Sequence, residues 1–295
     1  MKKELPVLFY KLLIVAATII WGASFVVVKD AVDVVSPTWL MGLRFTATAI
    51  ILMAVFAKKI ARNLDASHLF AGAILGVFSF LGFWIQTIGL TDTTPGRNAF
   101  LTATYCVMVP FLYWAVAKRK PTIFNIVAAF LCIAGVGFVS LGGDFSISMR
   151  WGDAMTLLSA VFFAIHMVLV AKFSERRDVM TITIVQIATS GLCGLLIGVA
   201  SEPVPNIGSL GLDFWIQLGY LVLFASCLAM VFQNVAQAKI PPAQAALLLS
   251  LESVFGVVFS VILYGEELTW MLLAGFSLIF AAIVISEIFP RPKKE

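Results

Sequence analysis

Charged residues are scarce in this sequence, and their scarcity decides its class. Asp, Glu, Lys and Arg make up 12% of the 295 residues, whereas hydrophobic residues make up 61% and the mean hydropathy is +1.02. Soluble domains carry about 25% charged and about 45–50% apolar residues, which excludes a soluble globular protein. Apolar runs long enough to cross a hydrocarbon core about 30 Å thick recur along almost the whole chain. The sequence therefore predicts a polytopic membrane protein.

Histidine and cysteine are also rare. The two histidines stand alone and the four cysteines lie inside apolar runs, which argues against a metal site and against disulfides between loops. We expect no cofactor, no metal and no nucleic-acid partner, only a small-molecule substrate and membrane lipid. The apolar run after Met1 is too long for a cleavable signal, and we interpret it as a retained first span.

Turn residues and charges divide the chain into ten predicted spans joined by short connections. The fold class is therefore all-α and integral to the membrane. The predicted spans cover residues 7–28, 37–57, 67–90, 96–117, 121–141, 151–172, 179–200, 213–237, 241–264 and 268–288.

The basic residues follow this division. With the N-terminus inside, sixteen of the 20 Lys and Arg residues fall in cytoplasmic loops and tails, as the positive-inside rule requires. We expect a multi-pass protein of the plasma (inner) membrane with both termini cytoplasmic.

The chain also carries a weak internal duplication at a spacing of about 146 residues. "TPGRNAFL" (94–101) matches "IPPAQAAL" (240–247), and "AKRKPT" (117–122) matches "YGEELT" (264–269). Two halves, residues 1–145 and 146–295, would each hold five helices, and an odd number forces the second half to be inverted in the membrane. Inverted repeats are typical of secondary transporters, with the substrate site at the repeat interface.

The matching loops have opposite charge, and in this arrangement they lie on opposite sides of the membrane. Glu266 and Glu267 of "YGEELT" are then expected in a water-facing external loop, with Glu266 capping or bracing the tenth helix.

Four motifs support a family resemblance. They are "WGASFVVVK" (21–29), "PTWLMGLRF" (37–45), "PGRNAFLTATYCVMVP" (95–110) and "AQAALLLSLESVFGVVFSVILYGEELT" (243–269). In this order they resemble the drug/metabolite transporter superfamily, in its ten-helix branch of two EamA repeats. The resemblance implies two inverted bundles around a central cavity and the outward movement of small metabolites, amino acids among them.

We therefore predict a secondary transporter, not an enzyme, that moves amino acids or related compounds, outward by resemblance, by alternating access. An intramembrane enzyme and a receptor or channel are the alternatives. The sequence offers no nucleophile–base pair or acid pair for the first, and no selectivity filter for the second.

Three ionisable residues lie at membrane depth, where a charge is costly and is by default a functional candidate. Glu252 is expected either to carry a proton or pair with a substrate amine, or to be a structural acid. Arg44 is expected either to hold a substrate carboxylate through its planar fork or to tie helix ends together. His166 aligns with Ser24 of the first half, so both are candidates to face the cavity, with helix packing as the alternative for His166.

A set of polar and aromatic residues completes the predicted substrate site. Asn98 and Tyr105 share one helix face, Gln244 and Glu252 share a face of the matching helix, and Gln86 pairs with Gln233 between the halves. Interhelical hydrogen bonding is the alternative for these polar residues. The predicted substrate-binding residues are Trp21, Ser24, Arg44, Gln86, Asn98, Tyr105, His166, Gln233, Gln244 and Glu252.

Two backbone features are also predicted. Gly194 and Gly198 have the spacing that lets membrane helices approach closely. Pro110 interrupts the fourth span and is expected to bend it.

Overall fold

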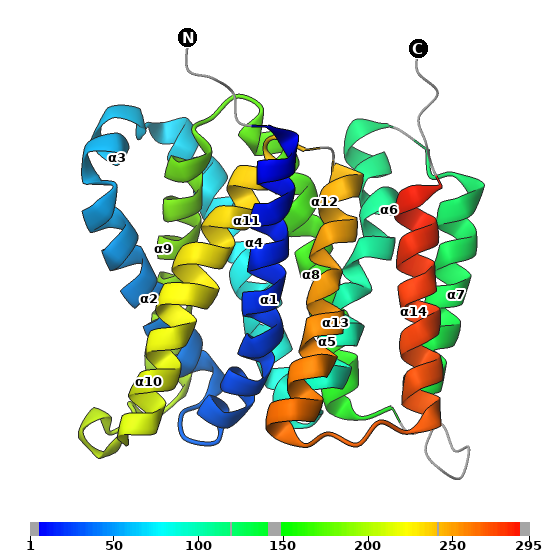
Figure 1. Ribbon diagram of the computed structural model, residues 1–295. Helices are drawn as coiled ribbons and strands as arrows, with labels where there is room; N and C mark the ends of the chain where they lie inside the picture. Colours follow the sequence, from blue (N-terminus) through cyan, green and yellow to red (C-terminus); the bar gives the residue numbers. More distant parts are fainter. Residues whose placement is uncertain (1–5, 119, 141–148, 241, 290–295) are drawn as a thin grey trace.

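The computed structural model describes residues 6–118, 120–140, 149–240 and 242–289, and within these ranges it contains helices and no strand. The helices run side by side along one common direction (Figure 1). Eight helical stretches in the described ranges are long and apolar enough to cross a membrane, and two shorter apolar helices, Ile123–Val139 and Trp270–Ile285, complete the set. The predicted ten-helix fold is confirmed.

The helices of the first half follow the predicted spans closely. They are α1 (Val7–Val32), α2 (Pro37–Val55), the short α3 (Ala57–Asn63), α4 (Ala66–Thr91), α5 (Pro95–Ala103), α6 (Tyr105–Ala117) and α7 (Ile123–Ser140).

The second half repeats this order without a counterpart of α3. Its main elements are α8 (Trp151–Ser174), α9 (Val179–Ser201), α10 (Leu212–Tyr220), η2 (Leu221–Leu228), α11 (Ala229–Gln237), α12 (Pro242–Leu249), α13 (Leu251–Phe259), η3 (Ser260–Tyr264) and α14 (Trp270–Ile288). A single 3₁₀ turn, η1 (Ile207–Ser209), precedes α10.

Side-chain caps start many of these helices where the sequence has a short polar residue. The side chains of Ser36, Asp65, Thr94, Asp178 and Thr269 each accept a hydrogen bond from the backbone N–H three residues on. Such caps satisfy a backbone donor that has no partner inside the helix. In a membrane protein this confines the helix ends to the polar boundaries.

The fourth and ninth spans are each interrupted at the same relative place. Thr104 separates α5 from α6, and Ser250 separates α12 from α13. Both hydroxyls donate to a carbonyl three residues back, Leu101 at 2.6 Å and Leu247 at 2.7 Å. The break in the fourth span therefore lies at Thr104, whereas Pro110 stays inside α6.

The C-terminal ends of the same two spans also match. Lys118 and Gly265, which the sequence alignment pairs, end them with φ angles of 58° and 73°. They are the two positive-φ residues of the described ranges. A left-handed residue commonly ends a helix, and the paired threonines, Thr122 and Thr269, then cap the next helix of each half.

Helices of the first half pack against helices of the second half, and the set of pairs stays the same when corresponding helices of the two halves are interchanged. α2 packs on α9 and α7 on α14, while α4 against α8 is matched by α1 against α11. Figure 1 shows α7 and α14 side by side at one edge, and the start of α1 and the end of α14 at the same end of the bundle. The outer surface is apolar: Phe70, Phe130 and Ile262 are 63%, 70% and 69% exposed, as expected of side chains that face lipid.

Glycines allow the closest of these contacts. A Cβ on Gly194 would lie 2.6 Å from the Gly42 nitrogen of α2, and one on Gly198 would lie 3.1 Å from the Trp39 ring. The predicted close packing at these two glycines is therefore confirmed, and α2 and α9 are in direct backbone contact.

Glu266 differs from the expectation of a solvated loop residue. Its side chain is buried, 9% exposed, and accepts hydrogen bonds from the Gly96 N–H at 2.9 Å and from the hydroxyls of Thr94 and Ser260. It therefore binds the start of α5, not the tenth helix. Glu267 is exposed as predicted. The start of a helix favours a carboxylate because its N–H groups lack partners and its dipole is positive there.

The same end of the bundle holds a second buried carboxylate. Asp153, in the first turn of α8, is fully buried, pairs with Arg97 and accepts a hydrogen bond from Thr93 at 2.7 Å. The turn between α4 and α5 is thus bound by α8 on one side and by Glu266 on the other.

The opposite end of the bundle is held by Asp178. It accepts from Lys59 at 2.9 Å, and its backbone N–H donates to His68 Nε2 at 3.1 Å. Burial by itself raises the pKa of this carboxyl, but the hydrogen bonds from Lys59 and Thr181 outweigh it and hold the pKa below its usual value. The helix α3 and the start of α4 are thereby tied to the loop before α9.

The glycine contact between α2 and α9 gives a direct stability test. Gly194→Ala is expected to lower the free energy of unfolding by about 1–3 kcal/mol, because the added methyl group overlaps the backbone of α2. Thermal denaturation in detergent checks it. Gly137→Ala is the control, since nothing lies within 4 Å of a Cβ at Gly137, and an equal effect of both changes contradicts the packing role.

The buried carboxylate of Glu266 gives a second test. Glu266→Ala is expected to lower the free energy of unfolding by at least about 2 kcal/mol, because three donors lose a charged acceptor. Glu267→Ala, at the exposed neighbouring position, is expected to leave the melting temperature unchanged. Equal melting temperatures for the two variants would show that Glu266 acts as a solvated loop residue.

Candidate functional site

The interrupted spans bring two polar side chains to the middle of the bundle. Tyr105 begins α6 just after the break at Thr104, and Glu252 lies in the first turn of α13 just after the break at Ser250. Tyr105 and Glu252 line the same cavity, and the two side chains are 5% and 7% exposed. Discontinuous helices at this depth commonly form the substrate sites of transporters.

A cavity lies against these two residues. It leaves about 50 Å³ for the centres of water-sized molecules, which is room for a few waters or for one small organic molecule of similar bulk. Its lining comes from both halves of the chain. The lining residues are Trp21, Ser24, Phe25, Val28, Arg44, Ser79, Phe83, Gln86, Thr87, Leu90, Thr102, Tyr105, Phe163, His166, Met167, Met230, Gln233 and Glu252.

Arg44 is the cation of this cavity. Its side chain is 2% exposed, and its guanidinium carbon lies 5.1 Å and 5.2 Å from the ring centroids of Phe45 and Phe83. Nε donates to Ser226 Oγ at 2.7 Å, whereas one terminal nitrogen is buried without a partner in the described ranges. No ion pair joins Arg44 to a carboxylate among the described residues. A buried charge with an unused donor is a suitable site for a ligand anion.

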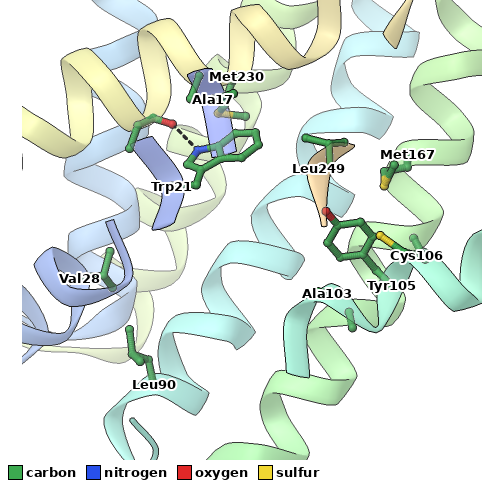
Figure 2. Packing of buried hydrophobic residues seen from close by; sticks show 14 of the residues in the cluster. Ala17, Trp21, Val28, Leu90, Ala103, Tyr105, Cys106, Met167, Met230 and Leu249 are labelled. Atoms are coloured by element: carbon green, nitrogen blue, oxygen red, sulfur yellow. Dashed lines mark hydrogen bonds between the residues drawn. The ribbon is translucent and has the colours of Figure 1, made fainter. Parts of the chain in front are cut away.

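Trp21 and Tyr105 stand on different sides of the cavity. Figure 2 shows Trp21 beside Met230, and Tyr105 beside Met167. The Trp21 indole donates to the carbonyl of Ala225 at 2.8 Å, the hydrogen bond that is drawn in the figure. Both rings belong to the cavity lining, where their apolar surface favours an apolar ligand body.

His166 and the paired glutamines add neutral polar groups. His166 is 3% exposed, and its Nε2 has no partner among the described residues. Gln86 donates to Thr102 at 2.8 Å, and Gln233 lies on the cavity wall as well. Ser24 also lines the cavity and donates to the Trp21 carbonyl of its own helix.

Eight of the ten predicted substrate-binding residues thus line one cavity, and two do not belong to its described lining. Asn98 is fully buried and donates to the Gln86 carbonyl at 3.2 Å and to Thr156 at 2.7 Å. Its contacts join α4, α5 and α8, which is the interhelical hydrogen bonding that was the alternative to cavity lining, and its substrate-binding role stays a prediction. Gln244 lies in α12, but its side chain is outside the described residues.

Sequence reasoning missed the apolar part of the lining, of which Phe83, Met167 and Met230 are examples. In a chain with 25 Phe and 10 Met residues, no local signal separates a cavity wall from ordinary packing. Phe163 could have been found, because the alignment that pairs Ser24 with His166 also pairs Trp21 with Phe163.

Comparisons with known proteins agree with this architecture. The sequence profile described as the EamA-like transporter family matches residues 8–141 and again residues 150–287. An uncharacterized transporter of Archaeoglobus fulgidus is 30% identical over 271 residues, which is 90% of this chain and 82% of that protein.

Further relatives cover similar shares. The uncharacterized inner membrane transporter YedA of Escherichia coli (strain K12) is 22% identical over 92% of this chain and 88% of its own. A probable amino-acid metabolite efflux pump of Salmonella typhimurium is 28% identical over 94% of this chain and 93% of its own. One crystal structure has the same fold, with a TM-score of 0.69 at 14% identity over 94% of this chain and 95% of that one.

The position of Asn98 generates a prediction that separates structure from binding. Asn98→Ala is expected to lower the free energy of unfolding by about 1–2 kcal/mol, since two interhelical hydrogen bonds are lost. Ligand affinity per folded molecule should not change. Ser24→Ala is the control for stability, because the Ser24 hydroxyl bonds only to its own helix. Normal stability with weakened binding in Asn98→Ala would place Asn98 in the site.

Proposed function

The chain belongs to the EamA-like transporter family, and from this premise we propose that it is a secondary transporter that works by alternating access. The observation that carries the proposal is the cavity itself. It lies at two matched helix breaks in the middle of the bundle, and Arg44, His166 and Glu252 line it together. An enzyme would need a reacting pair there, and an open channel would need a continuous wet path.

The proposed substrates are amino acids or closely related compounds. Arg44 has a free donor for a carboxylate, Glu252 supplies the acceptor for an amine, and Trp21, Phe83 and Phe163 supply an apolar wall. A small zwitterion with an apolar side chain matches this set of groups. The relative whose name describes an amino-acid metabolite efflux pump supports the same class and the outward direction.

Glu252 has a second candidate role. A carboxyl group that is buried beside Tyr105 and lines the substrate cavity is placed to exchange a proton with the cavity and so to couple transport to a proton gradient. In that case substrate and proton compete for the same acid, whereas a role in amine binding alone predicts no proton flux.

We also propose that the two halves, residues 1–145 and 146–295, are inverted repeats. The matched breaks, the paired left-handed residues and the exchange of packing partners between halves support this organisation. The start of α1 and the end of α14 lie at the same end of the bundle (Figure 1). We propose that this end faces the cytoplasm, together with the basic residues Lys59 and Arg177. The membrane is proposed to be the plasma (inner) membrane, as in the relative YedA.

The test is flux of a labelled amino-acid panel through proteoliposomes. The wild type is expected to move at least one apolar amino acid without altering it chemically. Arg44→Lys should lower kcat/KM by about 10-fold or more, because an ammonium group cannot reproduce the planar fork. Lys172→Arg, at an exposed site, is the control.

Two results would contradict the proposal. The first is the absence of flux for every member of the panel, and the second is wild-type kinetics in Arg44→Lys. Repeating the flux with Glu252→Gln under a pH gradient decides the second role of Glu252. Proton coupling requires that the dependence on the gradient disappear.

A further inference from the structure

The eighth span changes its helical form beside the cavity. Between α10 and α11, residues Leu221–Leu228 form a π-helix, η2. A π-helix shifts the register of the backbone hydrogen bonds and often marks a functional site. The residues of η2 that face α1 and α2 include three that are fully or almost fully buried, Val222, Ala225 and Ser226.

Each of these three residues accepts a hydrogen bond from a neighbouring helix. The Ala225 carbonyl accepts from Trp21 at 2.8 Å, the Val222 carbonyl accepts from Thr48 at 3.4 Å, and Ser226 Oγ accepts from Arg44 Nε at 2.7 Å. η2 is therefore a shared support for two residues that line the cavity, Trp21 and Arg44.

The contact with Ser226 controls the orientation of Arg44. The guanidinium is flanked by Phe45 and Phe83, and the bond from Nε to Ser226 fixes its rotation. With Nε engaged, Arg44 still lines the cavity, and one of its terminal nitrogens has no partner in the described ranges. Ser226 itself does not belong to the described lining, so it acts on a ligand only through Arg44.

We propose that Ser226 is a positioning residue, which holds the Arg44 fork toward the cavity and thereby sets the preference of the transporter for a carboxylate over an uncharged analogue. The inference rests on the proposed function, in which Arg44 receives the substrate carboxylate. It adds a residue outside the cavity that determines specificity, and it gives the π-helix a physical role. A regular helix would shift the register of the segment and move Ser226 away from Arg44.

The geometry also predicts which part of recognition depends on Ser226. Without the bond to Ser226, the Arg44 guanidinium keeps its charge but samples several rotations between the two rings. The two-point hydrogen bond to a carboxylate is then lost. Contacts with the amine and the apolar part of a ligand are unaffected. The change should therefore appear in the discrimination between an acid and its amide, not in affinity as a whole.

The experiment measures the affinity of purified protein for two acid–amide pairs by calorimetry, leucine with leucinamide and phenylalanine with phenylalaninamide. Of the two amino acids, the one that the wild type binds more tightly is expected to bind at least about 10-fold more tightly than its own amide. The amide lacks the charged hydrogen bond to Arg44, and its loss implies a difference of this size. Ser226→Ala should reduce this ratio to about threefold or less, with affinity for the amide unchanged. Ser226→Thr keeps the hydroxyl and should restore the ratio.

A matched control and a second variant make the result decisive. Ser159→Ala removes an equally buried hydroxyl that bonds only to its own helix, and it should leave the ratio unchanged. Ser226→Cys keeps the size of the side chain but has a weaker acceptor. It should lower the ratio of acid affinity to amide affinity, and this test remains if Ser226→Ala folds poorly.

The outcomes separate the two proposals. If the wild type and Arg44→Lys differ in their preference for the acid but Ser226→Ala and Ser226→Cys both keep the wild-type ratio, the positioning role is wrong and the proposed function stands. If affinity for acid and amide falls equally in Ser226→Ala, Ser226 has only a structural role. If the wild type shows no preference for either acid, the carboxylate site at Arg44 is wrong, and the positioning role falls with it.

Discussion

One constraint governs this molecule: inside a bilayer, backbone N–H and C=O groups have no water to bond with. Regular helices satisfy them internally, so an irregular backbone is tolerated at membrane depth only where protein or a cavity supplies partners. The breaks at Thr104 and Ser250 follow this rule, because both residues are almost fully buried and both hydroxyls bond to a nearby carbonyl. The π-helix η2 follows it as well, since Trp21 donates to one of its carbonyls. Two of these irregular segments, the breaks, directly precede the cavity residues Tyr105 and Glu252.

The same constraint explains why much of the site was visible in the sequence. A charge in an apolar run is costly unless it is paired or hydrated, so Arg44, His166 and Glu252 were candidates to face a central cavity, with structural roles as the alternatives. The structure places all three on the wall of the cavity. The ten spans could be located for a related reason, because hydropathy and Lys/Arg placement respond to the bilayer and not to details of packing. Whether these residues bind a substrate is a separate question, which placement alone does not answer.

What the sequence could not reveal depends on neighbours that are distant along the chain. Glu266 was expected to face water because it lies between two spans, yet it accepts hydrogen bonds from the Gly96 N–H and the Thr94 hydroxyl at the start of α5. Asn98 has the periodicity of a cavity residue, but it bonds to Thr156 of α8 instead. The proposed role of Ser226 depends on a change of helical register, which no residue of Leu221–Leu228 predicts. Each of these cases needs the three-dimensional partner to be known before the residue type can be interpreted.

Three polar contacts near the cavity connect the two halves of the chain. Arg44 with Ser226, Tyr105 with Glu252, and Trp21 with the Ala225 carbonyl each join a helix of the first half to one of the second. A ligand that binds Arg44 and Glu252 at once would therefore engage the same groups that hold the two halves together. Ligand binding and the relative movement of the halves would then both change the same small set of hydrogen bonds. Alternating access requires such a physical coupling.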